Sequence, residues 1–128
     1  MTTTSQKKLQ RILIVEDEKP MAHALELKLN HSGFETAVAF DGEAALENLK
    51  KQKFDLVLLD LMIPKINGFG VMKAMKENKD KTPVIIASNL GQDDDAQKAK
   101  TMGAAWYFVK SDTPINKIVD YIVGTLMS

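Results

Sequence analysis

Residues 56–64 of this chain read Leu56-Val57-Leu58-Leu59-Asp60-Leu61-Met62-Ile63-Pro64, an apolar run interrupted by a single carboxylate. An apolar run of this length is typical of a strand that is buried on both faces of a parallel sheet. A second run, residues 12–15, ends in the same way at the acid pair Glu16-Asp17. In open α/β sheets the carboxyl ends of the strands form the edge where ligands bind. The two runs therefore predict carboxylates gathered at a binding edge.

The composition limits the chain to one domain. Its 128 residues are 45% hydrophobic, which is enough for a single core. We expect a loose tail over residues 1–8 and one domain over residues 9–128. The 17 basic and 17 acidic residues balance and form no basic run, which argues against nucleic-acid binding by this chain alone. The sequence has no cysteine, no apolar leader and no apolar run of membrane-spanning length, so we predict a cytoplasmic protein without membrane insertion.

Short apolar runs alternate with segments of helical periodicity along the chain. The runs predict strands at residues 11–15, 35–39, 55–59, 83–87 and 105–109. Repeated β-α units with right-handed crossovers favour an α/β fold: a five-stranded parallel sheet of order 2-1-3-4-5, doubly wound with five helices and flavodoxin-like.

Helix start signals stand between the predicted strands. Pro20 can begin the first helix and Asp41 can cap the second, while two more helices follow Gly68 and Asp93. Thr113 is expected to cap the last helix, whose apolar stripe consists of Ile115, Ile118, Val119, Ile122, Val123 and Leu126. The helix after Asp93 offers mainly alanine to a core, so we expect it to be weakly anchored.

Polar side chains follow four of the five predicted strands: Glu16, Asp17, Asp60, Ser88 and Lys110. Three carboxylates at one edge repel one another unless a cation lies between them, which indicates a hard divalent metal such as Mg²⁺. We expect Asp17 and Asp60 to bind Mg²⁺ directly, and Glu16 to bind it directly or through water. The carbonyl of Met62 would add a neutral ligand.

Asp60 is the predicted nucleophile, because metal and ammonium are both available to stabilise charge on an incoming phosphoryl group. The product would be an acyl phosphate. Ser88 can donate a hydrogen bond to one phosphoryl oxygen and Lys110 can pair with another. Tyr107 lies on the strand face opposite Trp106, where its ring can swing inward when Ser88 is drawn to the phosphate. That movement would make Ser88 and Tyr107 switch residues; for Tyr107 the assignment rests on the family resemblance described next, and a buried strand tyrosine is the alternative.

With these residues, the chain resembles the receiver domain of two-component response regulators, of the single-domain chemotaxis type. The resemblance covers about residues 9–126. It is carried by Val15-Glu16-Asp17-Glu18, Leu59-Asp60-Leu61-Met62-Ile63-Pro64 with Asn67-Gly68, Ala87-Ser88, Gly103-Ala104, and Tyr107 three residues before Lys110.

The resemblance implies a phosphorylation-activated signalling switch rather than an enzyme. A histidine kinase or a histidine phosphotransfer protein would phosphorylate Asp60, with Mg²⁺ held by Glu16, Asp17, Asp60 and the Met62 carbonyl. The domain would assist its own phosphotransfer and dephosphorylation. The output face would consist of the helix after Asp93, the strand at residues 105–109 and the last helix. The kinase and the downstream protein cannot be named from the sequence, and a homodimer is left open.

Three residues depart from the family pattern. Ser111 replaces the proline that usually follows the lysine, often with a cis bond, so we expect Lys110 to be less rigidly placed. Asn89 is larger than the usual alanine or glycine and is expected to narrow access to Asp60. Glu16 replaces the commoner aspartate.

Other functions fit the residues less well. A phosphatase with an aspartyl nucleophile would have a second aspartate at Met62, and a nucleotide or flavin binder would have a glycine-rich or hydroxyl-rich loop where Glu16-Asp17-Glu18 stands. The closer alternative is a degenerate receiver that acts as a phosphorylation-independent interaction module. Glu18 is interpreted as a solvated residue, and Trp106 as either local packing or a contact patch.

Overall fold

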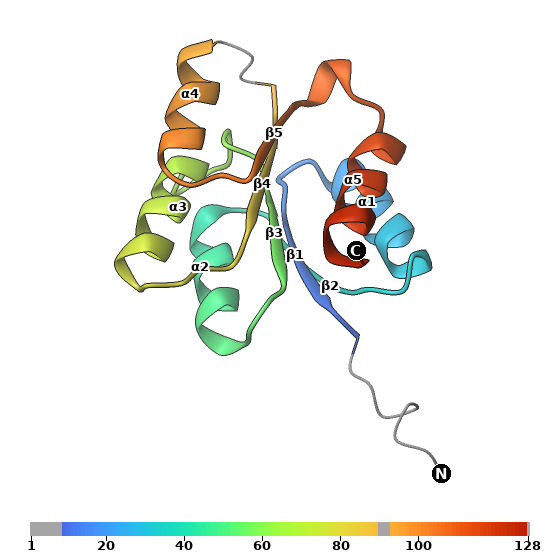
Figure 1. Ribbon diagram of the computed structural model, residues 1–128. Helices are drawn as coiled ribbons and strands as arrows, with labels where there is room; N and C mark the ends of the chain where they lie inside the picture. The colour runs from blue at the N-terminus through green and yellow to red at the C-terminus, as the bar shows by residue number, and fades with distance from the viewer. Residues whose placement is uncertain (1–8, 90–92, 128) are drawn as a thin grey trace.

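Five parallel strands form one central sheet in the computed structural model, which describes residues 9–89 and 93–127 (Figure 1). The strand order is β2-β1-β3-β4-β5, as predicted. The strands are β1 (Arg11–Val15), β2 (Glu35–Ala39), β3 (Leu56–Leu59), β4 (Val84–Ser88) and β5 (Trp106–Val109). The predicted tail at residues 1–8 lies outside the described residues.

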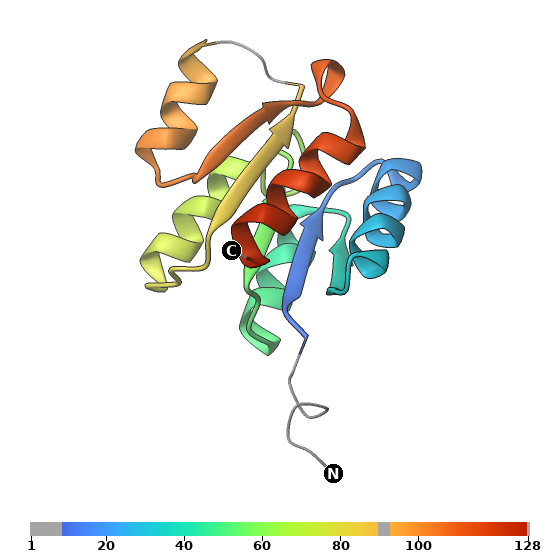
Figure 2. The ribbon, with the colours of Figure 1, turned by 45° about the vertical axis from the view of Figure 1, so that its right-hand side comes forward.

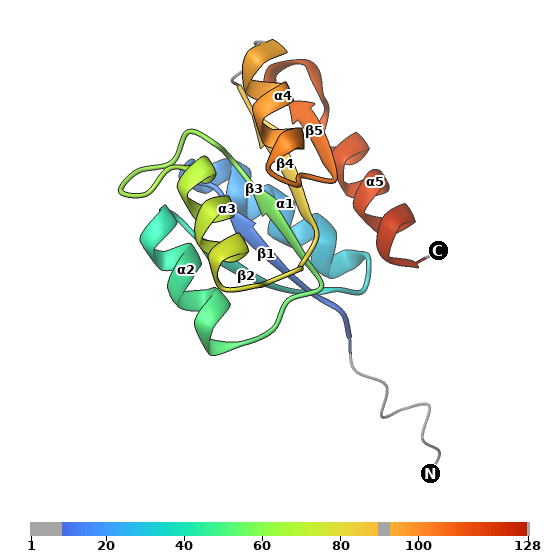
Figure 3. The same cartoon turned by 60° about the vertical axis from the view of Figure 1, so that its left-hand side comes forward.

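Helices cover both faces of this sheet. They are α1 (Lys19–His31), α2 (Gly42–Lys51), α3 (Gly68–Glu77), α4 (Asp93–Thr101) and α5 (Ile115–Met127), with a 3₁₀ turn, η2 (Lys110–Asp112), before α5. Figures 2 and 3 show α1 and α5 on one face and α2, α3 and α4 on the other. The predicted α/β fold is confirmed. Among the described residues, none of the helices is long and apolar enough to cross a membrane.

The sheet separates two hydrophobic cores. Leu13 and Val15 of β1 belong to the core under α2 and α3, whereas Ile12 and Ile14 belong to the core under α1 and α5. Successive strand residues point to opposite faces, so a strand covered on both sides must be apolar at every position. All four residues of β3 are buried, which explains the unbroken run before Asp60.

The helix start signals are mostly confirmed. Pro20 lies in the first turn of α1, and the Asp41 side chain caps α2 by accepting a hydrogen bond from the Ala44 N–H at 2.7 Å. The predicted cap at Thr113 is wrong. Because η2 separates β5 from α5, the Thr113 hydroxyl instead donates to the Val109 carbonyl at 2.8 Å, and α5 begins at Ile115.

Strand boundaries differ from the predicted ones by one residue. β3, β4 and β5 begin one residue later than expected, and Ser88 is the last residue of β4 instead of following it. The flanking residues still form hydrogen bonds to the neighbouring strand: the Asp55 N–H donates to the Arg11 carbonyl at 2.7 Å and the Ala105 N–H donates to the Val84 carbonyl at 2.8 Å. Strand margins of this kind cannot be located from an apolar pattern.

The segment after β3 folds back against the end of its own strand. The Gly68 N–H donates to the Leu61 carbonyl at 3.0 Å, and a Cβ at Gly68 would lie 2.6 Å from Leu61 Cα. Asn67 caps α3 by accepting a hydrogen bond from Gly70 at 2.9 Å. Asn67-Gly68 thus starts α3 and allows the backbone to approach the residue next to Asp60, which a larger residue would prevent.

Helix α4 places few of its described side chains in the core, as its composition predicted. Ala99 is fully buried, while Gln97, Lys98 and Lys100 are exposed. Met102, after the helix, packs partly against the core under α2 and α3. Since alanine buries little apolar area, α4 has less burial energy than the other helices.

Candidate phosphoacceptor and metal site

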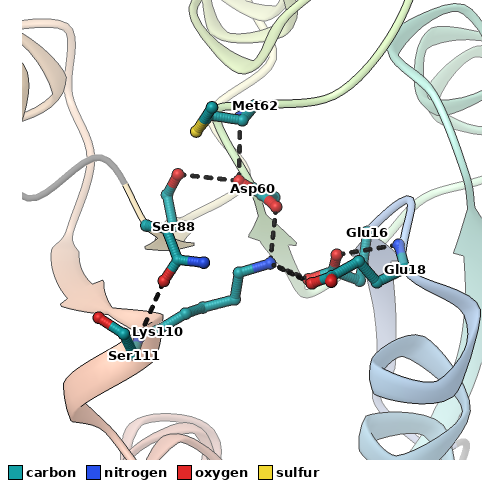
Figure 4. A network of polar contacts seen from close by, with 8 residues as sticks. Glu16, Glu18, Asp60, Met62, Ser88, Lys110 and Ser111 are labelled. Carbon is teal, nitrogen blue, oxygen red and sulfur yellow. Dashed lines mark hydrogen bonds and ion pairs between the residues drawn. The ribbon is translucent and has the colours of Figure 1, made fainter.

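Side chains from four strands meet at the carboxyl edge of the sheet (Figure 4). Glu16 and Asp17 follow β1, Asp60 follows β3, Ser88 ends β4 and Lys110 follows β5. The strand order places β1, β3, β4 and β5 next to one another, so their ends lie side by side. The structure therefore brings together the five side chains on which the predicted site depends.

Asp60 is buried, with only 4% of its surface exposed, and both of its carboxylate oxygens accept hydrogen bonds. Oδ1 accepts from the Ser88 hydroxyl at 2.8 Å and from the Met62 N–H at 2.9 Å. Oδ2 accepts from Lys110 Nζ at 2.8 Å. Both oxygens of this buried carboxylate therefore have hydrogen-bond partners.

Lys110 lies between the carboxylates (Figure 4). Its Nζ is 2.8 Å from Glu16 Oε1 and 2.8 Å from Asp60 Oδ2, and its side chain is 7% exposed. Burial alone would lower the pKa of Lys110, but the hydrogen bonds to Asp60 and Glu16 outweigh burial and raise it. The side chain is therefore an ammonium that neutralises part of the acid edge.

Glu16 is as buried as Asp60, and its carboxylate accepts two hydrogen bonds. Besides Lys110, its carboxylate accepts from the Glu18 N–H at 3.1 Å. Burial raises the pKa of Glu16, while the hydrogen bonds from Lys110 and from the Glu18 N–H offset part of that rise. Glu16 is thus a desolvated acid whose charge depends on a nearby cation.

Glu18 was predicted to be only a solvated residue, and that interpretation is incomplete. Its side chain is 65% exposed, but Oε1 lies 3.4 Å from Lys110 Nζ. Glu18 also stands at the N-cap position of α1, where it makes no side-chain cap hydrogen bond. The position of Glu18 directly after Glu16-Asp17 could have indicated this contact, because it brings a third carboxylate near Lys110.

The acid residues at this edge have the chemistry of a cation site. Carboxylate oxygens of Glu16, Asp17 and Asp60 all lie within 4.8 Å of one another, and Asp17 is exposed to solvent. Oxygen donors at this spacing suit a hard divalent cation such as Mg²⁺. The backbone N–H of Met62 donates a hydrogen bond to Asp60, so Met62 lies next to these acids.

Residues of β5 divide between the two faces of the sheet. Tyr107 packs partly against the core under α2 and α3, whereas Trp106 and Phe108 contact Tyr121 of α5 with ring centroids 5.5 Å away in each pair. Burial, followed by the charges of Asp95 and Asp60, raises the pKa of Tyr107, which keeps its hydroxyl protonated. Trp106 nevertheless remains 44% exposed, so it is both packed locally and available for contact.

The fold and this edge define a doubly wound α/β protein with a buried carboxylate site. Residues 12–122 match the family model of the response regulator receiver domain. The chain therefore belongs to the response regulator receiver domain family.

The chain is also similar in sequence to named bacterial regulatory proteins. The chain is 37% identical over 102 residues to the response regulator ArlR of Staphylococcus saprophyticus, covering 80% of this chain and 46% of ArlR. It is 39% identical over 100 residues to the transcriptional regulatory protein DltR of Streptococcus agalactiae, covering 78% of this chain and 45% of DltR. The chain thus matches slightly less than half the length of these relatives.

A solved structure of the family has the same fold. The receiver domain of the Francisella response regulator 1452 superimposes with a TM-score of 0.84 at 26% identity, over 93% of this chain and 99% of that chain. The two domains therefore share the same architecture over nearly their whole length.

Proposed function

We propose that this chain is a phosphorylation-controlled switch that accepts a phosphoryl group on Asp60. The set of hydrogen-bond donors around Asp60 supports the proposal most directly. Ser88 and Met62 donate to one carboxylate oxygen, and Lys110 donates to the other. The phosphoryl donor would be a phosphohistidine of a histidine kinase or of a histidine phosphotransfer protein. Receiver membership supports this class of partner.

In the proposed transfer, a carboxylate oxygen of Asp60 attacks the phosphorus atom. A P–O bond forms, the P–N bond to the histidine breaks, and its electron pair remains on the imidazole nitrogen. Ser88 would exchange its hydrogen bond to Asp60 for one to a phosphoryl oxygen, and Lys110 would pair with another. Attack by water on the acyl phosphate then returns the carboxylate and inorganic phosphate.

Glu16, Asp17, Asp60 and the carbonyl of Met62 are the proposed holders of Mg²⁺. Bound there, the ion would neutralise charge on the phosphoryl oxygens. The residues fit it because three carboxylates share one edge, and the ammonium of Lys110 offsets only part of their charge. The chain itself would contribute the nucleophile and two donors, so we regard it as a phosphoacceptor that assists its own reaction and not as a classical enzyme.

The proposed output face consists of α4, β5 and α5. Tyr107 on β5 packs against the same core as Ala99 of α4, and Trp106 lies partly exposed over α5. A movement of Ser88 toward a phosphoryl group would be followed by Tyr107 and by the weakly anchored α4. The partner at this face, dimerisation and a cytoplasmic location stay predictions, as does the division into a tail and a domain at residue 9.

Phosphorylation of purified protein tests the proposal. Acetyl phosphate with Mg²⁺ is expected to add one phosphoryl group, detected by intact-mass measurement, and Asp60→Asn is expected to abolish the addition. Asp120→Asn, an exposed aspartate on α5, is the matched control and should label like the unmodified protein. Equal labelling of Asp60→Asn would remove Asp60 from its role. The alternative, a phosphorylation-independent interaction module, requires that the unmodified protein is not labelled at all.

A further inference from the structure

Asn89 and Ser111 are joined by a hydrogen bond across the end of the sheet. The Asn89 side-chain oxygen Oδ1 accepts from the Ser111 N–H at 2.9 Å. Ser88 pairs with Val109 in the parallel register, so Asn89 and Lys110 stand one step beyond the last paired residues. The Asn89 side chain therefore continues the connection between β4 and β5 by one bond, at the edge that carries the site.

This hydrogen bond holds the backbone from which the Lys110 side chain begins. The Ser111 N–H and the Lys110 carbonyl belong to the same peptide group. That carbonyl accepts from the Thr113 N–H at 3.2 Å, within the η2 turn. Both polar atoms of the peptide group thus have partners, one from the end of β4 and one from η2. A peptide group held at both atoms has a defined plane.

The same two segments also reach Asp60. Ser88, the neighbour of Asn89, donates to Asp60 Oδ1, and Lys110, the neighbour of Ser111, donates to Asp60 Oδ2, each at 2.8 Å (Figure 4). The bond between Asn89 and Ser111 therefore closes a ring that includes both oxygens of the carboxylate. A shift of the Lys110 backbone away from β4 would stretch the bond between Asn89 and Ser111.

We propose that Asn89 is a positioning residue for phosphotransfer, acting through Ser111 on Lys110. The proposal rests on the proposed function of Asp60. It also gives one explanation for the two unusual residues: a proline at position 111 would lack the donor, and an alanine at position 89 would lack the acceptor. The sequence alone predicted a loosely placed Lys110, because it did not reveal the hydrogen bond between Asn89 and Ser111. Asn89 compensates for the missing proline.

A double-mutant cycle tests the coupling. The rate of phosphorylation by acetyl phosphate with Mg²⁺ is measured for the unmodified protein, Asn89→Ala, Ser111→Pro and the double variant. Loss of one hydrogen bond predicts a rate about three- to tenfold lower for Asn89→Ala when Ser111 is present. In the Ser111→Pro background, which has no N–H to hold, Asn89→Ala should not slow the reaction. Asn116→Ala, an exposed residue on α5, is the control for an asparagine outside the site.

A second measurement reads the hydrogen bond without phosphorylation. Hydrogen exchange of the Ser111 amide, followed by NMR, should be about three- to tenfold faster in Asn89→Ala than in the unmodified protein. Asn89→Asp keeps an acceptor oxygen and should restore slow exchange. This measurement also distinguishes positioning from a general loss of stability, because only the Ser111 amide is expected to respond.

The outcomes separate the two proposals. If Asn89→Ala changes the rate by the same factor in both backgrounds, Asn89 acts independently of Ser111, and the positioning role is overturned. Unchanged exchange at Ser111 overturns it as well. Failure of the unmodified protein to be phosphorylated contradicts the function of Asp60 and with it the role of Asn89 in phosphotransfer.

Discussion

The ammonium of Lys110 lies as close to Glu16 as to Asp60, at 2.8 Å from an oxygen of each. All three side chains are almost completely buried, so the lysine bridges two desolvated carboxylates that would otherwise repel each other. Its position therefore matters for the stability of the fold as well as for the proposed chemistry.

Lys110→Met is expected to destabilise the metal-free protein. The substitution keeps the length of the side chain but leaves two buried carboxylates without their cation, which costs about 3 kcal/mol of unfolding free energy. Urea unfolding in the presence of EDTA measures the change. Lys117→Met, on the exposed side of α5, should shift the unfolding free energy by less than about 0.5 kcal/mol. Equal midpoints for the two variants would show that the bridge adds no stability.

Asp17→Asn is expected to weaken Mg²⁺ binding about tenfold or more, since it removes one charged oxygen ligand while leaving the buried network intact. Asp17 is exposed, so the substitution should have little effect on folding. NMR titration with Mg²⁺ measures the affinity without any phosphoryl donor. Asp120→Asn serves as the control, and an unchanged affinity in Asp17→Asn would place that residue outside the metal ligands.

Gly68→Ala is expected to destabilise the segment behind Asp60. The new Cβ would lie 2.6 Å from Leu61 Cα and 2.8 Å from the Asp60 carbonyl oxygen, so the backbone must shift, at a cost of about 1–3 kcal/mol. The matched control is Gly124→Ala in α5, where nothing lies within 4 Å of the new atom. There alanine should stabilise the helix by about 0.5–1 kcal/mol. Thermal unfolding compares the two, and destabilisation of equal size at both positions would contradict the steric argument.

Beryllofluoride, a mimic of the phosphoryl group, is expected to change hydrogen exchange most in α4 and β5. Helix α4 has little buried apolar area, and Tyr107 connects β5 to the core beneath it. Exchange followed by mass spectrometry, with and without beryllofluoride and Mg²⁺, measures the response. Asp60→Asn should show no response. A change limited to α1 and α2 would contradict the proposed output face.

Much of the fold could be predicted because each signal is local. Leu56–Leu59 are apolar at every position since helices cover both faces of β3, and Asp41 caps α2 with an oxygen three residues from its donor. Topology rules then place the ends of the parallel strands at one edge of the sheet. The sequence therefore predicts that Asp60 and Lys110 lie near each other. Thr113 shows the limit of a local signal, because its hydroxyl bonds to Val109 in a turn that the pattern did not predict.

Contacts between distant segments depended on the tertiary structure. The sequence identified Glu16, Asp60 and Lys110 as neighbours, but only strand register and packing determine that Lys110 contacts both acids and also Glu18. The hydrogen bond between Asn89 and Ser111 joins residues 22 positions apart and depends on where β4 and β5 end. Periodicity and capping act over a few residues and specify the elements, whereas distances between their ends follow from how the elements pack, which no local pattern contains.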